Sequence, residues 1–290
     1  MVTAVQSRVR AADFVELTKP GIISLILVTV AAGYYMGASG IHGLALFHTL
    51  LGAALVAAGS NALNQIAERD LDARMRRTRS RPLPSGRIGV VEAQVFAWGL
   101  SFTGTAYLLT MVGPLVAALA AATLVSYVFL YTPLKRHTTL NTLVGGVPGA
   151  LPIVGGWVAA RGTIDLVALV LFAVLYLWQM PHFLALAWML REDYARAGIR
   201  MLSIGDDGSM TFRQAVGYSA ALLPVTLVPS VLGATGIVYF FGAVALALWL
   251  LWESWMAGRL RTHERARRLF LTTVAYLPAL LVLMMVDKLP

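Results

Sequence analysis

Residues 44–78 read LALFHTLLGAALVAAGSNALNQIAERDLDARMRRT. The first two thirds of this stretch are apolar, and their length is that of a helix of about 20 residues, which crosses a bilayer. The last third alternates acidic residues with arginines. A membrane helix that ends in such a run predicts a polar site at the membrane surface.

Three oxygen-bearing side chains in this stretch, Asn64, Glu68 and Asp72, are each four residues apart. On an α-helix, residues four apart lie one above the other, so these side chains would form one column. Amide and carboxylate oxygens suit Mg²⁺, which takes its remaining ligands from water and phosphate. The alternative is that Glu68, Asp70 and Asp72 pair with neighbouring arginines in a solvated loop.

The composition excludes an ordinary soluble protein. The 290 residues are 58% hydrophobic and 13% charged, whereas about 25% charged is usual in soluble domains. The chain has no cysteine, which excludes disulfides and thiol chemistry. We therefore expect an all-α polytopic membrane protein with one domain over residues 1–290 and nine transmembrane helices. The expected spans are residues 22–36, 44–67, 91–111, 115–131, 140–160, 166–190, 215–231, 237–256 and 269–286.

The basic residues define one face of this topology. Of the 23 lysines and arginines, all but Arg161 and Lys288 fall on the same side of the expected spans, together with the N-terminal Arg8. By the positive-inside rule this side is cytoplasmic, which places the N-terminus inside and the C-terminus outside. The net charge of +9 then reflects topology. The basic loops lack a reading motif and stacking aromatics, so nucleic-acid binding is not expected.

Two cytoplasmic connections, residues 68–89 and 191–213, are unusually long for a membrane bundle. Each follows a span that ends in acidic and basic residues, and four spans separate them. This pattern suggests a weak internal repeat with halves near 1–138 and 139–290. The two charged helix ends would then face one another across a cavity.

Basic residues near the acidic column are candidates for binding a phosphorylated anion, because the guanidinium fork matches phosphate oxygens. Arg81 lies in a Pro- and Gly-containing turn, and Lys135 and Arg136 lie on the same side of the membrane. The ordinary positive-inside excess explains Arg81 and Arg87 equally well.

The second half carries a polar sequence, WQMPHF, at residues 178–183 inside an apolar span. Pro181 frees a backbone carbonyl and predicts a kink, beside which His182 would face a cavity. A neutral histidine that only packs against another helix is the alternative. Further along, Glu192 and Asp193 could hold a second metal or form a helix-end ion-pair cluster.

Glycine pairs mark the span 140–160, at residues 145–146 and 155–156, with Gly149 between them. Small residues at these positions allow either close packing of a neighbouring helix or a flat ligand against the backbone.

Six motifs distributed over nearly the whole chain resemble the UbiA-type superfamily of intramembrane prenyltransferases. WQMPHF and the EDY of the last motif point to its haem-farnesylating branch. This resemblance implies nine transmembrane helices around a lateral cavity. The motifs are LTKPGI at 17–22, the column with MRRT at 64–78, RPLPSG at 81–86, NT at 141–142, WQMPHF at 178–183 and REDYARAGI at 191–199.

The resemblance also implies an activity, transfer of a farnesyl group from farnesyl diphosphate to a vinyl group of haem B, giving haem O. Mg²⁺ would be held by Asn64, Glu68 and Asp72, with Asp193 as a further catalytic residue. His182 would ligate or orient the haem iron. The environment is the bilayer of a bacterial-type cytoplasmic membrane, and a downstream haem-modifying membrane enzyme is a candidate partner. The implied substrate-binding residues are Lys19, Arg77, Arg81, Lys135, Arg136, Asn141, His182, Arg191 and Glu192.

The chain departs from the superfamily pattern in both acidic motifs. Glu68 stands where aspartate is more usual, and Met189, four residues before Asp193, is apolar. Two alternatives remain, namely a sister prenyltransferase of an aromatic quinone precursor and a transporter or non-catalytic haem-handling protein. A transporter should concentrate ionisable groups near the bilayer midplane, whereas the acids here lie at helix ends.

Overall fold

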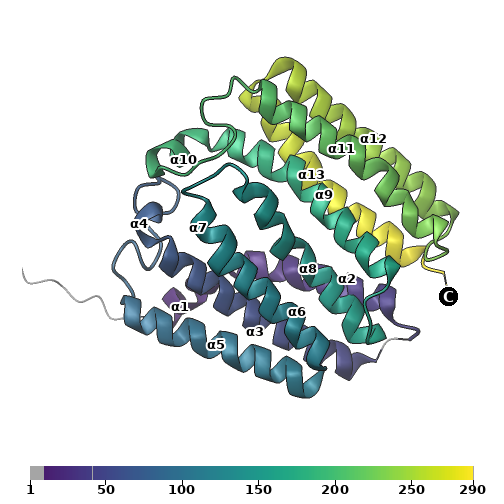
Figure 1. Cartoon of the computed structure of the whole chain (residues 1–290), viewed down its shortest axis with the longest axis horizontal. Coiled ribbons are helices and arrows are strands. Elements are labelled where there is room, and N and C mark those ends of the chain that lie inside the picture. Colours follow the sequence, from purple (N-terminus) through teal and green to yellow (C-terminus); the bar gives the residue numbers. More distant parts are fainter. Residues whose placement is uncertain (1–9, 41, 290) are drawn as a thin grey trace, which may run out of the picture.

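The computed structural model describes residues 10–40 and 42–289, so Arg8 lies outside the described residues. It is a bundle of long helices that run side by side, with short helices and loops gathered at one end (Figure 1). The elements are α1 (Ala11–Thr18), α2 (Pro20–Gly37), α3 (Gly43–Ala67), α4 (Arg69–Asp72), α5 (Val90–Met111), α6 (Pro114–Val125), the π-helix η1 (Ser126–Tyr131), α7 (Thr132–Leu134), α8 (Asn141–Arg161), α9 (Leu166–Met189), α10 (Arg191–Ala197), α11 (Ser209–Val231), α12 (Ile237–Leu260) and α13 (His263–Val286).

Eight helices of the described chain are long and apolar enough to cross a membrane, with α6, η1 and α7 together forming one of them. The ninth expected span is α5, which has 22 residues but carries Glu92 and Gln94 among several Ser and Thr residues. It lies along α3 over most of its length (Figure 1), and Val91, Val95 and Phe102 on it are exposed. The expected all-α membrane architecture is confirmed, and α5 accounts for the difference between nine and eight.

Several helices extend beyond the apolar windows expected from the sequence. α11 begins at Ser209 rather than at residue 215, because Asp206 accepts hydrogen bonds from the N–H groups of Met210 and Thr211. Only two residues separate α12 from α13, where Thr262 caps the N-terminus of α13. Hydropathy marks the part of a helix that lies in lipid, whereas capping decides where the helix ends.

Glycines set the contact between α2 and α8. A Cβ added at Gly156 would lie 2.0 Å from the carbonyl oxygen of Val30, and one added at Gly33 would lie 2.0 Å from that of Ile153. Gly155 has no atom within 4 Å of an added Cβ. The sequence left packing and ligand contact open for these glycines, and packing explains Gly156.

The far end of the bundle is closed by the C-terminal segment. The Lys288 ammonium donates a hydrogen bond of 2.7 Å to the carbonyl oxygen of Tyr35 and another to that of Ala38, where α2 ends. The C-terminus therefore lies at the end of the bundle opposite α1 (Figure 1).

Candidate active site

The acidic column lies where α3 ends, but it is not carried by one continuous helix as the sequence analysis expected. α3 stops at Ala67, Glu68 adopts φ −99° and ψ 7°, and Asp72 ends the short α4. The amide N–H of Glu68 still donates to Asn64 O (2.9 Å), and that of Asp72 to Glu68 O (2.8 Å). These bonds preserve the four-residue spacing across the break, and all three side chains are buried.

Asn64 is held through both ends of its amide. Its Oδ1 accepts a hydrogen bond of 2.9 Å from the Lys19 ammonium. Lys19 joins α1 to α2 with a left-handed backbone (φ 56°), a conformation that costs free energy in a residue other than glycine and is concentrated at functional sites. Burial and the neighbouring charge of Arg81 lower the pKa of Lys19 from 10.5 to about 7.

Thr132 holds the other end of Asn64. The Thr132 hydroxyl accepts from Asn64 Nδ2 (3.1 Å) and donates to the carbonyl oxygen of Tyr127 (2.8 Å), five residues earlier. This spacing belongs to the π-helix η1, and π-helical turns are frequent at functional sites. The sequence alone did not indicate a role for Thr132, because neither hydropathy nor spacing reveals a π-helical turn.

Asp72 pairs with Arg81, whose Nη1 lies 2.7 Å from Asp72 Oδ2. The Asp72 side chain is 1% exposed, and its Oδ1 has no hydrogen-bond partner in the part of the chain that the structure describes. A buried carboxylate oxygen without a partner is unusual. The alternative of solvated pairing fits only Asp70, which is exposed and pairs with Arg69.

Glu68 pairs with Lys135, and the two charged atoms lie 2.6 Å apart. The Lys135 ammonium also sits 4.5 Å above the centre of the Tyr131 ring. Three basic residues of the candidate set, two of them far away in sequence, thus reach the three oxygen groups of the column.

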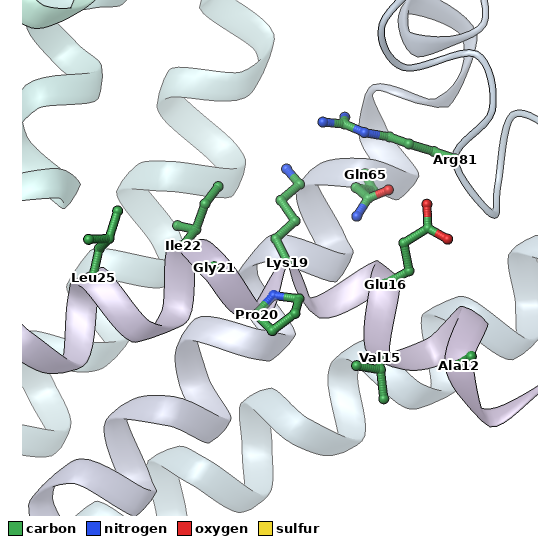
Figure 2. Close-up of a pocket in the computed structure, with 10 residues that line it drawn as sticks. All are labelled: Ala12, Val15, Glu16, Lys19, Pro20, Gly21, Ile22, Leu25, Gln65 and Arg81. Carbon is green, nitrogen blue, oxygen red and sulfur yellow. The ribbon is translucent and has the colours of Figure 1, made fainter. Parts of the chain in front are cut away.

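A pocket of about 600 Å³ opens beside this cluster. Lys19 and Arg81 point toward the same space at its polar end, next to Gln65 (Figure 2). Ile22 and Leu25 line its other end and are exposed on the surface of α2. The pocket therefore joins a basic end to an apolar end, as the lateral cavity expected from the resemblance would.

Gln65 is a second polar residue of the site, after Thr132, whose role was not predicted from the sequence. Its Nε2 donates to the carbonyl oxygen of Leu17 (2.8 Å). Its Oε1 is buried and has no hydrogen-bond partner among residues 10–40 and 42–289. In the sequence, only its position directly after Asn64 points to a role in the site. Glutamines with a purely structural role also occur beside such residues, so this position alone does not predict a role.

The segments that follow α3 and α9 come together through an apolar contact. Leu71 and Met75 pack against Ala197 and Ile199. Asp193, on α10, forms an ion pair with Arg196. Partial burial opposes ionisation of Asp193, but hydrogen bonds from the Arg196 side chain and the Arg76 backbone, with the charge of Arg77, hold its pKa below the usual value.

The other candidates of this region lie around the cluster and not in it. Arg191 stacks on the Trp188 ring, 4.4 Å from its centre. Arg77, Arg136 and Glu192 are exposed.

Asn141 is buried and donates to the carbonyl oxygens of Thr138 and Arg200, each at 2.6 Å. The Arg200 amide in turn donates to Lys135 O (2.8 Å). Asn141 therefore fixes the loop that carries Lys135 and does not reach the acidic column itself.

Arg87 fastens α1 to the turn before α5. It pairs with the buried Asp13 and with Glu16 (2.8 Å), and also donates to the carbonyl oxygen of Ser80 (2.8 Å). Arg87 has a structural role, whereas Arg81 from the same turn reaches the cluster.

His182 lies between α9 and α13. Its Nδ1 is 2.8 Å from the Thr273 hydroxyl, and its ring packs against Trp178, Phe183 and Phe270. It is half-buried. The structure therefore places it in a helix contact, away from the acidic column.

The match to known families agrees with this geometry. The model of the UbiA prenyltransferase family matches residues 26–278. The chain belongs to the UbiA prenyltransferase family. Among curated members, a protoheme IX farnesyltransferase of Solibacter usitatus is 47% identical and covers 95% of this chain and 98% of its own length. The protein of the same name from Aquifex aeolicus is 40% identical, with 95% and 94% covered. The chain is therefore a prenyltransferase.

Solved structures share the fold at low sequence identity. A study of digeranylgeranylglyceryl phosphate synthase in membranes provides a chain with a TM-score of 0.81 and 18% identity, covering 95% of this chain and 97% of that one. A UbiA homologue from Archaeoglobus fulgidus, bound to GPP and Mg²⁺, has a TM-score of 0.65 and 14% identity, covering 94% and 99%. These likenesses show that the chain shares the fold of these structures.

Proposed function

We propose that this prenyltransferase transfers the farnesyl group of farnesyl diphosphate to a vinyl group of haem B, giving haem O. Relatives named protoheme IX farnesyltransferase match it over nearly their whole length, which supports this choice of substrates. The observation that carries the chemistry is the cluster of buried oxygen groups and half-buried cations beside a pocket with an apolar end. Such a cluster can hold a diphosphate while its prenyl chain remains in an apolar environment.

The residues present fit a Mg²⁺ ion. The column offers an amide oxygen and two carboxylates, all of them hard ligands, and the free Oδ1 of Asp72 is one lone-pair donor within it. Among the described residues, no three or more His, Cys, Asp and Glu side chains gather into a metal site. The column itself supplies two carboxylates and one amide, so the remaining ligands of Mg²⁺ would be phosphate and water. Mg²⁺ bound there would supply positive charge that stabilises the departing diphosphate.

Lys19, Arg81 and Lys135 would bind the diphosphate oxygens. They already converge on one site from three separate segments, so little reorganisation is needed. Fixed cations in a largely buried site stabilise the negative charge that develops on the leaving group. Arg77 and Arg136, which are exposed, would add positive charge at the entrance.

The bond changes balance as follows. The bond between farnesyl carbon 1 and oxygen breaks, and diphosphate leaves with the electron pair. A vinyl carbon of haem forms the new carbon–carbon bond, and water adds to the other vinyl carbon and loses a proton. Apolar residues such as Ile22 and Leu25 at the pocket's far end would keep water from the farnesyl chain until haem has reacted.

We assign the haem to the α9 side, with His182 as its contact. Arg191, Glu192 and Asp193 lie at the cytoplasmic end of the same region and would contact substrate from the surface. Asn141 contributes through the loop of Lys135. Because haem O is hydrophobic and would stay in the membrane, we propose as partner a membrane enzyme that modifies haem O further.

The orientation that we propose follows the basic residues. The cluster and the charged helix ends face the cytoplasm, and the C-terminus lies outside a bacterial-type cytoplasmic membrane. We also retain the two halves, near 1–138 and 139–290, as a proposal.

The test is product formation by the purified protein with haem B, farnesyl diphosphate and Mg²⁺. The expected product is an extracted haem whose mass has increased by one farnesyl group and one hydroxyl group. Absence of this product, together with prenylation of an aromatic acid, would instead establish the sister activity. The variant Asp72→Asn provides the matched negative control.

A further inference from the structure

Thr273 of α13 makes two contacts with α9, which lies beside it (Figure 1). Its carbonyl oxygen accepts a hydrogen bond of 2.8 Å from Trp178 Nε1. Its hydroxyl lies 2.8 Å from His182 Nδ1. Thr273 is fully buried, so these contacts are not shared with solvent.

The hydroxyl proton of Thr273 is already used. Thr273 Oγ1 donates to the carbonyl oxygen of Phe270 at 2.6 Å. A hydroxyl has one proton to donate and lone pairs that accept. The contact with His182 therefore runs the other way, with His182 Nδ1–H as the donor and Thr273 Oγ1 as the acceptor.

This direction fixes the tautomer of His182. A neutral imidazole carries its proton on one nitrogen only, and the hydrogen bond that one nitrogen makes decides the state of the other. With the proton on Nδ1, Nε2 keeps its lone pair. Nε2 has no hydrogen-bond partner in residues 10–40 and 42–289, and the His182 side chain is half-buried.

The ring orientation is fixed as well. Trp178 lies stacked on His182 with ring centres 5.4 Å apart, and Phe270 packs at 4.8 Å. Trp178 is in turn tied to Thr273 O. Thr273 therefore sets the tautomer of the imidazole and, together with Trp178 and Phe270, its position.

We propose that Thr273 is a positioning residue that holds His182 Nε2 as a ligand for the iron of the haem substrate. The proposal rests on haem as the prenyl acceptor. Iron-binding histidines regularly donate their other N–H to an acceptor in the protein, which orients the ring and strengthens the ligand. Thr273 Oγ1 is that acceptor here.

The test is titration of ferric haem B into the purified protein in detergent, followed by absorption and electron paramagnetic resonance spectroscopy. Wild type should show a histidine-ligated spectrum that His182→Ala loses. Thr273→Val, which keeps the side-chain shape without the hydroxyl, should weaken haem affinity about tenfold or more and shift the spectrum toward that of His182→Ala. Thr273→Ser should restore both.

Thr272→Val is the matched control, because Thr272 is the buried neighbour on the same helix. It should leave spectrum and affinity unchanged, and farnesyl diphosphate binding should be the same in all variants. A wild-type spectrum in Thr273→Val, or the same shift in Thr272→Val, overturns the proposal. If Thr273→Val does not fold, Thr273→Ala removes the same hydroxyl and must produce the same shift.

Failure of the proposed function has a different signature. A wild-type protein that forms no farnesylated haem disproves that function whatever the spectra show. A wild-type protein that forms the product, with an unchanged spectrum in Thr273→Val, disproves only the role of Thr273.

Discussion

The Nζ atom of Lys135 lies 2.6 Å from Oε1 of Glu68. A cation that we propose to bind diphosphate therefore neutralises a carboxylate that we propose to bind Mg²⁺. Arg81 and Asp72 form a second such pair at 2.7 Å. A metal ion that binds alone must displace a cation and leave it half-buried without a partner. Pyrophosphate that binds alone leaves buried carboxylates unpaired. Binding both together gives every group a new partner.

We therefore expect Mg²⁺ and pyrophosphate to bind cooperatively. Breaking a buried pair without replacing it costs about 3–5 kcal/mol, and even a small part of this gives a tenfold coupling, since about 1.4 kcal/mol is tenfold in affinity. Calorimetric titration of Mg²⁺ with and without pyrophosphate measures this directly. Lys135→Met should reduce the coupling, because Glu68 is then free from the start. Equal Mg²⁺ affinity in both titrations would contradict the exchange of partners.

Asp72 and Asp70 provide a matched pair of acids. Asp72→Asn should abolish Mg²⁺-dependent product formation, because it removes a buried carboxylate of the column. Asp70→Asn should retain activity, since Asp70 is exposed and pairs only with Arg69. Turnover of both purified variants, with their helix content checked by circular dichroism, tests the column. Equal losses of activity in the two variants would contradict a specific role of Asp72 in binding the metal.

Arg81 and Arg87 belong to one turn and should separate binding from stability. Arg81→Met should weaken farnesyl diphosphate binding and also lower the melting temperature, because it leaves the buried Asp72 without its cation. Arg87→Met should lower the stability by about 1–3 kcal/mol, because it leaves the buried Asp13 unpaired, while farnesyl diphosphate binding by the folded protein stays unchanged. Thermal unfolding and ligand binding, measured on both variants, distinguish them. The assignment is wrong if Arg87→Met melts as wild type does.

Gly156→Ala should damage the contact between α2 and α8. The added Cβ would lie 2.0 Å from the Val30 carbonyl oxygen, and overpacking of this kind costs about 1–3 kcal/mol or more. The control is Gly155→Ala, where the space is open. The yield of monodisperse protein and its melting temperature should fall only for Gly156→Ala.

Membrane topology can be tested directly because the chain has no cysteine. His263→Cys, at the short connection between α12 and α13, should be protected from a membrane-impermeant maleimide in intact cells. Leu289→Cys, at the opposite end of the bundle, should be labelled. Labelling of both cysteines, or the reverse pattern, would exclude the proposed orientation.

Part of the acidic site could be predicted from the sequence. The spacing of Asn64, Glu68 and Asp72 predicted a column, and the backbone bonds preserve it. The break at Glu68 was not predicted, because a helix end beside acids and arginines depends on the ion pairs that fold around it. The roles of Arg81 and Arg87 were indistinguishable in sequence, since each is an arginine in the same turn.

The sequence by itself determined the membrane class, the approximate spans and the face that carries the acids. These features depend on hydropathy and helical periodicity, which are local properties. Only the tertiary structure decided which groups are partners. Lys19 reaches Asn64 across 45 residues, Asn64 reaches Thr132 across 68, and His182 reaches Thr273 across 91. No local pattern encodes such pairs, because they arise when separate helices pack, and close glycine contacts and a π-helical turn set how those helices face one another.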